Sequence, residues 1–346
     1  MYKYFASQIH MTNILRTIAI IIISVLAASC SPRDRFITIT GYAQGGTYSV
    51  KLNLNGKDGM IKTRPETIRD SIDAILQNID SSLSGYNKNS LLSRFNNGEA
   101  IVPDHIFTDI FGHAVRIFDE TQGVVDAASG PLFDLWGFGF RSGEFPSEEE
   151  VAQAMEACGM KRMLEQKKGQ LNYNAIAQGY SCDLIAEYLY SIGVKDMMVD
   201  IGEIFCDGHN PAGMPWSVGI DKPIDGNNEL GAQIQGIFRA PDGPHGIVTS
   251  GNYRKFYMKD GKKYAHSIDP RTGYPVNHNL LSATIVANDA ITADAYATYC
   301  MVVGLEESKA LLDSRNNLEG CLIYDEEGTF MSWCSEGFVL TDVQTR

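Results

Sequence analysis

The stretch between residues 196 and 287 is a succession of short apolar segments separated by tight, glycine-containing turns. Short turns of this kind join antiparallel neighbours. The expected strands are 196–201, 216–220, 232–238, 246–250, 253–258 and 282–287, and the expected helices are 65–83, 104–121, 177–192, 290–304 and 305–312. Helices that are segregated from strands of mixed order predict an α+β protein in which antiparallel pairing dominates.

Shorter signals complete the expected elements. Residues 36–42 and 47–54 alternate as strands around Gly45-Gly46, which predicts a hairpin-like or ligand-approaching turn. Ser147 followed by Glu150 is a capping box, which predicts the start of a helix. The other expected features are a helical turn at 90–96, an irregular glycine- and aromatic-rich segment at 123–143, and a closing hairpin of strands 321–324 and 330–333.

Composition and charge limit what the chain can bind. With 346 residues and 44% hydrophobic residues, it can bury a core as one large domain or as two closely packed lobes. We find no internal repeat, low-complexity linker or domain break. The net charge of −13 argues against nucleic acids and against anionic membranes bound through charge. A polyphosphate ligand would need a metal ion or helix N-termini to offset the repulsion.

The N-terminus has the pattern of an export signal. Arg16 precedes an apolar run at 18–26, which is too short to span a bilayer, and three small residues then lead to Cys30. This predicts a lipoprotein signal peptide at 1–29, a lipid anchor at Cys30, a tether at 30–36 and a domain at 37–346. The alternative is a plain signal peptide cut nearby, and Met11 could be the true start. Either way we expect an exported protein, on the periplasmic side of a bacterial membrane and lipid-anchored rather than spanning.

The remaining six cysteines are scattered, without C-x-x-C or Cys/His ligand spacing. They are Cys158, Cys182, Cys206, Cys300, Cys321 and Cys334. A zinc site is therefore not expected. An exported chain could pair some of them, but the sequence does not say which, and buried free thiols are the default.

Residues 266–298 combine a turn with the start of a helix. Asp269-Pro270 and Thr272-Gly273 predict a tight turn with a positive-φ exit. Asp294 and Thr298 are four residues apart, so on a helix their oxygens project from one face. A carboxylate and a hydroxyl of this kind suit Mg²⁺, which takes few protein ligands and keeps positions for phosphate and water. The alternative is an ordinary N-cap with a threonine that bonds back to the helix.

Further glycine-marked clusters lie along the chain, which has no Walker A loop, G-x-G-x-x-G, H-E-x-x-H or EF-hand pattern. Alone, most of the clusters are ordinary turns or helix ends, but the glycines around Trp136 and Phe138 predict a flat aromatic wall, which would suit a ring ligand and would equally fill a core. The clusters are Gly45-Gly46-Thr47-Tyr48, Leu83-Ser84-Gly85-Tyr86, Gly123-Val124-Val125-Asp126, Gly130-Pro131-Leu132, Leu135-Trp136-Gly137-Phe138-Gly139, Asn174-Ala175-Ile176-Ala177-Gln178-Gly179-Tyr180 with Asp183, Val199-Asp200-Ile201-Gly202-Glu203-Ile204 and Thr249-Ser250-Gly251-Asn252-Tyr253-Arg254.

Taken in order, these clusters resemble the ApbE family, the FAD:protein FMN transferases. The most specific matches are H-x-I-D-P-x-T-G, which begins at His266, and D-A-x-A-T, which begins at Asp294. The resemblance runs from Gly46 to Thr298. Four departures are Gly45 where a methionine is usual, Gln178 where a lysine is usual, Asn172 where an acid is usual, and Gly202-Glu203, which lacks one glycine.

The resemblance implies a single large domain of ApbE or T-fold type that binds FAD in an extended form, with Mg²⁺ at its pyrophosphate. The FMN half would pass to a threonine or serine hydroxyl of an acceptor protein, releasing AMP. Asp294, Thr298 and the carbonyl of Ala175 would bind the metal. His266 is the expected general base, because its ordinary pKa lies near working pH; the alternative is a histidine that only bonds across the Asp269-Pro270 turn. The residues expected at FAD are Gly45, Thr47, Tyr86, Val124, Val125, Asp126, Asn172, Gln178, Asp183 and Ile268.

Two other functions remain open on the sequence alone. One is a Mg²⁺-dependent FAD pyrophosphatase, in which water replaces the acceptor hydroxyl. The other is a flavin-binding lipoprotein without turnover, which the departures at Gly45, Asn172 and Gln178 favour.

Overall fold

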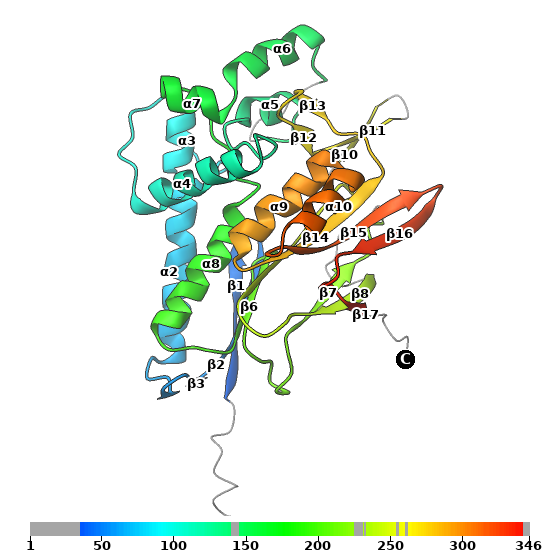
Figure 1. The fold of residues 1–346 in the computed structure, drawn as a ribbon. Coiled ribbons are helices and arrows are strands. Elements are labelled where there is room, and N and C mark those ends of the chain that lie inside the picture. The colour runs from blue at the N-terminus through cyan, green and yellow to red at the C-terminus, as the bar shows by residue number, and fades with distance from the viewer. Residues whose placement is uncertain are drawn as a thin grey trace, which may run out of the picture.

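An eight-stranded antiparallel sheet forms the centre of the protein (Figure 1). The computed structural model describes residues 35–139, 145–224, 231, 233–253, 256–259 and 262–341. The strand order is β1 (Phe36–Ala43), β2 (Gly46–Asn53), β5 (Met197–Asp200), β6 (Ile204–Asp207), β9 (His245–Gly251), β14 (Leu280–Ala287), β15 (Glu319–Glu326) and β16 (Thr329–Cys334). Every neighbouring pair is antiparallel, which confirms the predicted fold class.

Smaller sheets surround the central one. A three-stranded sheet has the order β17 (Leu340–Thr341), β8 (Ile234–Arg239) and β7 (Ser217–Asp221). The two-stranded sheets are β3 (Asn55–Gly56) with β4 (Gly59–Met60), β10 (Phe256–Lys259) with β11 (Lys262–Ala265), and β12 (Ile268–Asp269) with β13 (Tyr274–Pro275). The strand predicted at 253–258 thus begins three residues later, at Phe256.

The helices follow the predicted ranges closely. They are α2 (Pro65–Leu83), α3 (Leu91–Asn96), α4 (His105–Glu120), α5 (Gly130–Leu135), α6 (Glu148–Ala157), α7 (Met160–Gln166), α8 (Ala177–Ser191), α9 (Ala290–Val303) and α10 (Leu305–Ser314). The capping box at Ser147 is present, with both hydrogen bonds made. The prediction of an irregular segment at 123–143 was wrong for α5, where Pro131 sits in the first turn and favours helix. Helix α7 was not predicted.

Helices cover one face of the central sheet and the three-stranded sheet covers the other (Figure 1). Helices α2 and α8 pack on β1, β2 and β5, whereas α9 and α10 pack on β9, β14 and β15. On the opposite face, Trp216 and Phe238 lie against Ile247 and Val286. This layering buries apolar side chains on both faces of the central strands.

Helices α3 to α7 form a separate lobe above α8 and α9 (Figure 1). Its core contains Ile110, Met160 and Tyr173, and it continues onto Ile291 and Ala295 of α9. The loops of this lobe are therefore held against the helix that carries the predicted metal ligands.

Three sequence predictions lie outside the described residues. They are the whole N-terminal region up to residue 34, with the signal peptide, Cys30 and most of the tether, the end of the irregular segment at 140–143, and the position of Arg254. Within the described ranges, no helix has the length and apolar character needed to cross a membrane.

Candidate active site

The first turns of α8 and α9 cross at very short range. A Cβ atom on Gly179 would lie 2.3 Å from the carbonyl oxygen of Ala290, so only glycine fits at this crossing. Asp183 of α8 ties the two helices together, because its carboxylate oxygens accept hydrogen bonds from the backbone N–H of Ala290 and of Ile291, both at 2.8 Å. These donors are otherwise unpaired at a helix start.

Asp294 lies in the middle of this crossing. Its side chain is 5% exposed, and its Oδ2 accepts a hydrogen bond from the backbone N–H of Gly179 at 3.1 Å. Burial raises its pKa well above the ordinary value, and the negative charges of Glu203 and Asp183 add to the increase. A carboxylate in this setting is stabilised by a proton or by a cation.

The helix cap is Asp289 rather than Asp294. The Asp289 carboxylate accepts a hydrogen bond from the Thr292 N–H at 2.8 Å, as an N-cap does. The alternative in which Asp294 is only a cap was therefore wrong. As the spacing predicted, Thr298 follows one turn later on the same helix. Its side chain is half-buried.

Three further predicted residues surround this crossing. Gln178 donates from its side-chain Nε2 to the carbonyl oxygen of Ile201 at 3.0 Å. Gly45 and Thr47 are exposed at the tip of the β1–β2 hairpin. This tip lies on α8, because the Gln44 amide donates to the hydroxyl of Ser181.

The loop that contains Val124, Val125 and Asp126 is held by its own side chains. Both valines are buried, so only their backbone can reach a ligand. The Asp126 carboxylate accepts hydrogen bonds from the N–H groups of Ala128 at 2.7 Å and Met160 at 3.0 Å, and burial raises its pKa. The side chain of Asp126 therefore builds the loop as well as facing the pocket described below.

The neighbouring loop before α8 is attached to this one. Asn172 donates its backbone N–H to the carbonyl oxygen of Ala127 at 2.7 Å, and its side-chain Oδ1 accepts from the N–H of Asn174 at 2.9 Å. Ala175, the predicted carbonyl ligand, is half-buried in the same loop. Tyr86 lies elsewhere, on the loop between α2 and α3, and its side chain is 71% exposed.

The turn that follows His266 is closed by backbone hydrogen bonds. The carbonyl oxygen of Asp269 accepts the N–H groups of Thr272 and Gly273, and Gly273 has φ +82° as predicted. Ile268 is 1% exposed within an apolar cluster, so it can offer a ligand only its backbone.

Aromatic residues of the helical lobe position this turn. The indole N–H of Trp136 donates to the carbonyl oxygen of Gly273 at 2.9 Å. The ring of Phe138 meets the half-buried ring of His266 edge to face, with centroids 6.4 Å apart. The sequence indicated a wall of glycines and aromatic residues here, but not that it packs on the histidine turn.

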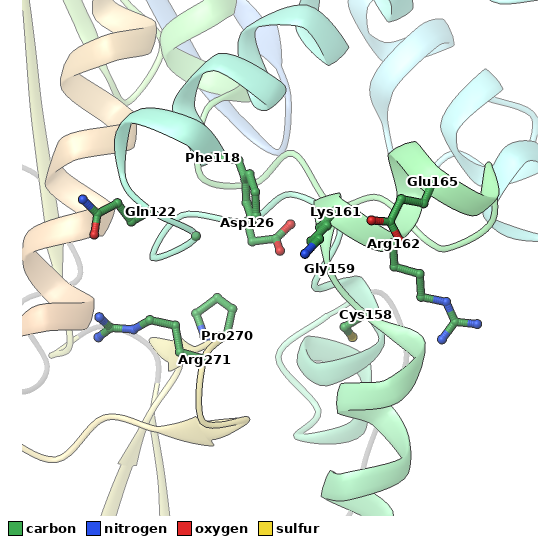
Figure 2. Close-up of a pocket in the computed structure, with 11 residues that line it drawn as sticks. Phe118, Gln122, Asp126, Cys158, Gly159, Lys161, Arg162, Glu165, Pro270 and Arg271 are labelled. Carbon is green, nitrogen blue, oxygen red and sulfur yellow. The ribbon is translucent and has the colours of Figure 1, made fainter.

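A pocket of about 400 Å³ lies between the Asp126 loop and the Pro270 turn (Figure 2). Lys161, Arg162 and Arg271 bring positive charge to its lining, together with the acids Asp126 and Glu165. Figure 2 shows Asp126 and Lys161 extending toward the middle of the pocket. No sequence motif pointed to the two basic residues on α7. Only the structure shows that these residues and the Pro270 turn line the same pocket.

Comparisons with known proteins show the family to which the chain belongs. The sequence pattern of the ApbE family matches residues 44–322. This chain belongs to the ApbE family. It is 32% identical over 348 residues to the FAD:protein FMN transferase of Haemophilus influenzae, covering 95% of this chain and 98% of the relative. It is 33% identical over 298 residues to that of Escherichia coli K12, covering 81% and 83%.

Solved structures of ApbE proteins share the fold. The flavin transferase ApbE from Vibrio cholerae superposes with a TM-score of 0.75 at 30% identity, covering 88% of this chain and 98% of that one. The ApbE protein of Thermotoga maritima gives a TM-score of 0.71 at 25% identity, covering 87% and 97%. The protein described here is therefore a single ApbE domain over the matched residues.

Two departures from the ApbE pattern lie in contact with each other. A Cβ on Gly202 would approach the Gln178 Nε2 to 3.2 Å, and Gly202 has φ +100°. Gln178 therefore anchors the shortened turn after β5 through its bond to Ile201. The departure at Gly45 has a separate cause. With Gln44, Gly45 forms a two-residue hairpin turn in which both residues have positive φ. A methionine at this position would be strained.

Among the described residues, no group of three or more histidine, cysteine, aspartate or glutamate side chains is arranged to hold a metal ion. The predicted magnesium ligands are of a different kind, one carboxylate with a hydroxyl and a carbonyl. The buried, acid-surrounded Asp294 fits a cation, because a positive charge would offset both its burial and the charges of Glu203 and Asp183.

Proposed function

We propose that this ApbE protein transfers the FMN half of FAD to a threonine or serine hydroxyl of an acceptor protein and releases AMP. The observation that carries the proposal is the buried Asp294 at the α8–α9 crossing, in a chain whose relatives are named FAD:protein FMN transferases. The acceptor oxygen attacks the phosphorus on the FMN side, and the bond from this phosphorus to the bridging oxygen breaks. The bridging oxygen leaves with AMP.

Asp294, Thr298 and the carbonyl of Ala175 would hold Mg²⁺. Bound there, the metal supplies positive charge to the pyrophosphate and keeps coordination positions for its oxygens. This chain needs such a charge because its net charge of −13 repels FAD. The two charges that shift the pKa of Asp294 belong to Glu203 and Asp183 and are both negative, so they cannot offset the charge of its own carboxylate.

His266 would take the proton from the attacking hydroxyl. The turn after it closes through backbone hydrogen bonds from Thr272 and Gly273 to the carbonyl oxygen of Asp269. Contacts with Phe138 and the bond from Trp136 to Gly273 hold the turn in one place. A base held in place in this manner typically contributes about 10²–10⁴-fold to rate.

The FAD would lie along the line of predicted contacts from the hairpin tip to the Asp126 loop. The exposed ring of Tyr86 offers a face for a flat ligand, while Val124, Val125 and Ile268 offer backbone only. Asp183 is already bound to the α9 N-terminus, so its role is to build the site.

We further propose that the mature protein is exported and held at the periplasmic face of a membrane by lipid on Cys30. The support is sequence alone: Arg16, the apolar run at 18–26 and the small residues before Cys30. A mass spectrum of the N-terminal peptide from membrane fractions checks this, and a chain that starts at residue 1 or at an unmodified residue beyond Cys30 would contradict it.

The test of the activity is one incubation with two arms. Protein, FAD and Mg²⁺ are mixed with or without a flavin-acceptor domain, and products are separated on a denaturing gel and by chromatography. Covalent flavin fluorescence on the acceptor, with one AMP for each flavin bound, supports transfer. Free FMN and AMP in both arms would mean hydrolysis, and unchanged FAD would mean binding alone.

A further inference from the structure

The closing hairpin carries two cysteines that the proposed chemistry does not use. Cys321 on β15 and Cys334 on β16 are direct partners in the register, and their sulfur atoms are 2.6 Å apart. This is closer than unbonded sulfurs pack and close to the roughly 2.05 Å of a disulfide bond. We propose that Cys321 and Cys334 form an intrachain disulfide that fastens the base of the β15–β16 hairpin.

The backbone is already suited to this bond. The N–H of Ser335 donates to the carbonyl oxygen of Gly320 at 2.9 Å, so residues 320 and 335 are a hydrogen-bonded pair. Such pairs alternate with non-hydrogen-bonded ones along antiparallel strands, which places Cys321 and Cys334 in a non-hydrogen-bonded pair. Their Cα atoms are then about 4.5 Å apart, inside the range of roughly 4.4–6.8 Å for disulfides. The strands need not move.

This pair differs from the other described cysteines. Cys182, Cys206 and Cys300 are buried, and in the described part of the chain only Cys321 and Cys334 bring sulfur to sulfur. Cys334 is half-buried on the edge strand and can meet a reagent, whereas Cys321 is fully buried. The contact with Cys321 also lowers the pKa of the Cys334 thiol, which increases its thiolate fraction.

The chemistry is thiol–disulfide exchange with an external disulfide, either of an oxidoreductase or of a small molecule. The Cys334 thiolate attacks one sulfur of this disulfide, and the other sulfur leaves as a thiolate. The Cys321 sulfur then loses its proton, attacks Cys334 in the mixed disulfide and displaces the second external thiolate. Two protein thiols are oxidised to one disulfide while the external disulfide is reduced to two thiols.

The bond would secure the point where the chain leaves the central sheet. After Cys334, the Glu319 carboxylate accepts hydrogen bonds from the Ser335 hydroxyl and, at 3.0 Å, from the Gly337 N–H. Phe338 then stacks on Phe238 with centroids 4.2 Å apart, and β17 pairs with β8 (Figure 1). The disulfide thus fixes the segment that joins the eight-stranded sheet to the three-stranded sheet.

This inference is independent of the transferase activity. Oxidising compartments outside the cytoplasm favour such a bond, but the geometry of the hairpin carries the inference. The test therefore uses purified full-length protein and a defined oxidant rather than the cell.

Reduced protein is equilibrated with mixtures of oxidised and reduced glutathione, unfolded in an alkylating reagent, digested and mapped by mass spectrometry. We expect one cross-linked peptide pair that joins Cys321 to Cys334, while Cys158, Cys182, Cys206 and Cys300 remain alkylated. Glutathione on Cys334 without the cross-link, a link from either cysteine to another one, or alkylation of both Cys321 and Cys334 at every ratio would overturn the proposal.

Thermal melts of three proteins provide a second readout. Oxidised wild type should melt about 2–5 °C above reduced wild type, because the cross-link restricts the unfolded chain. The matched control is Cys206→Ser, which removes a buried thiol from the same apolar cluster. Cys206→Ser should keep the difference in melting temperature between oxidised and reduced protein, and Cys334→Ser should lose this difference. A difference that persists in Cys334→Ser would overturn the proposal, and the peptide map of wild type decides the question if either variant fails to fold.

Discussion

The α8–α9 crossing and the histidine turn are held in place by opposite means. At the crossing, carboxylates bind backbone N–H groups: Asp294 binds Gly179, and Asp183 binds the first residues of α9. At the turn, aromatic side chains from another lobe do the positioning, through the indole of Trp136 and the ring of Phe138.

In the proposed function, the first region binds the metal ion and the second takes up the proton. The crossing buries several carboxylates close together. Its stability therefore depends on whether a cation or a proton binds there. The turn is held by packing and one buried hydrogen bond, so its position depends on the helical lobe. We therefore expect charge changes to affect the first region and shape changes to affect the second.

The largest effect should come from Asp294→Asn. The change is nearly isosteric and keeps an acceptor for Gly179, but it removes the charge that would hold Mg²⁺. We expect the Mg²⁺ concentration for half-maximal transfer to rise by roughly 10²-fold or more. The melting temperature without metal should be unchanged or higher, because a buried carboxylate is removed.

The control for that change is Asp289→Asn on the same helix. Asparagine is as good an N-cap as aspartate, so this variant should keep both stability and the Mg²⁺ titration of wild type. Superimposable Mg²⁺ titrations for wild type and Asp294→Asn would show that this face of α9 holds no metal.

His266→Ala should rank next. Loss of a general base slows transfer by roughly 10²–10⁴-fold. FAD affinity, measured by fluorescence quenching, should stay near wild type, because the backbone hydrogen bonds to Asp269 that close the turn remain. A variant that transfers at the wild-type rate would return His266 to a structural role.

Trp136→Phe should have a smaller effect. It keeps an aromatic ring but removes the N–H that binds the carbonyl of Gly273. We expect kcat to fall about 10-fold, since leaving a buried carbonyl unpaired costs about 1–3 kcal/mol and shifts the turn. The KM for FAD should change little.

Trp216→Phe is a matched control for this variant. Trp216 is also buried, and its indole N–H donates to the carbonyl of Asp207 at the same 2.9 Å, but it lies under the three-stranded sheet. It should lose stability without losing kcat. Equal losses of kcat in both variants would mean that stability, not the position of the turn, limits the rate.

The same comparison explains what the sequence could predict. Local patterns succeeded where neighbours in sequence decide the structure: the Ser147 capping box, the one-turn spacing of Asp294 and Thr298, and the β1–β2 hairpin, whose turn lies at Gln44-Gly45, one residue before the predicted Gly45-Gly46. They also gave the fold class, because short turns between apolar strands leave mainly antiparallel pairings.

Contacts between distant segments could not be predicted in this way. The carboxylate of Asp183 accepts hydrogen bonds from the first residues of α9, which lie 107 residues later in the sequence. Tertiary packing alone also brings Gln178 against Gly202. It likewise places Lys161 and the Pro270 turn around the same pocket. The family resemblance named the residues, and the fold showed what each one touches.

The smallest expected effect is the pH dependence of Asp183. Burial raises its pKa to about 7; the N–H groups of Ala290 and Ile291 lower it, while Asp289 and Glu187 raise it further. Because the folded pKa lies above the unfolded value of about 3.9, the folded state binds an extra proton between these two values. Its contribution is therefore greatest below about pH 4 and is lost as pH rises toward 7. Asp183→Asn cannot titrate, so wild type should lose stability relative to this variant across that window. Melts of both proteins from pH 4 to 8 without metal measure the difference, and a constant difference would show that Asp183 is ionised throughout.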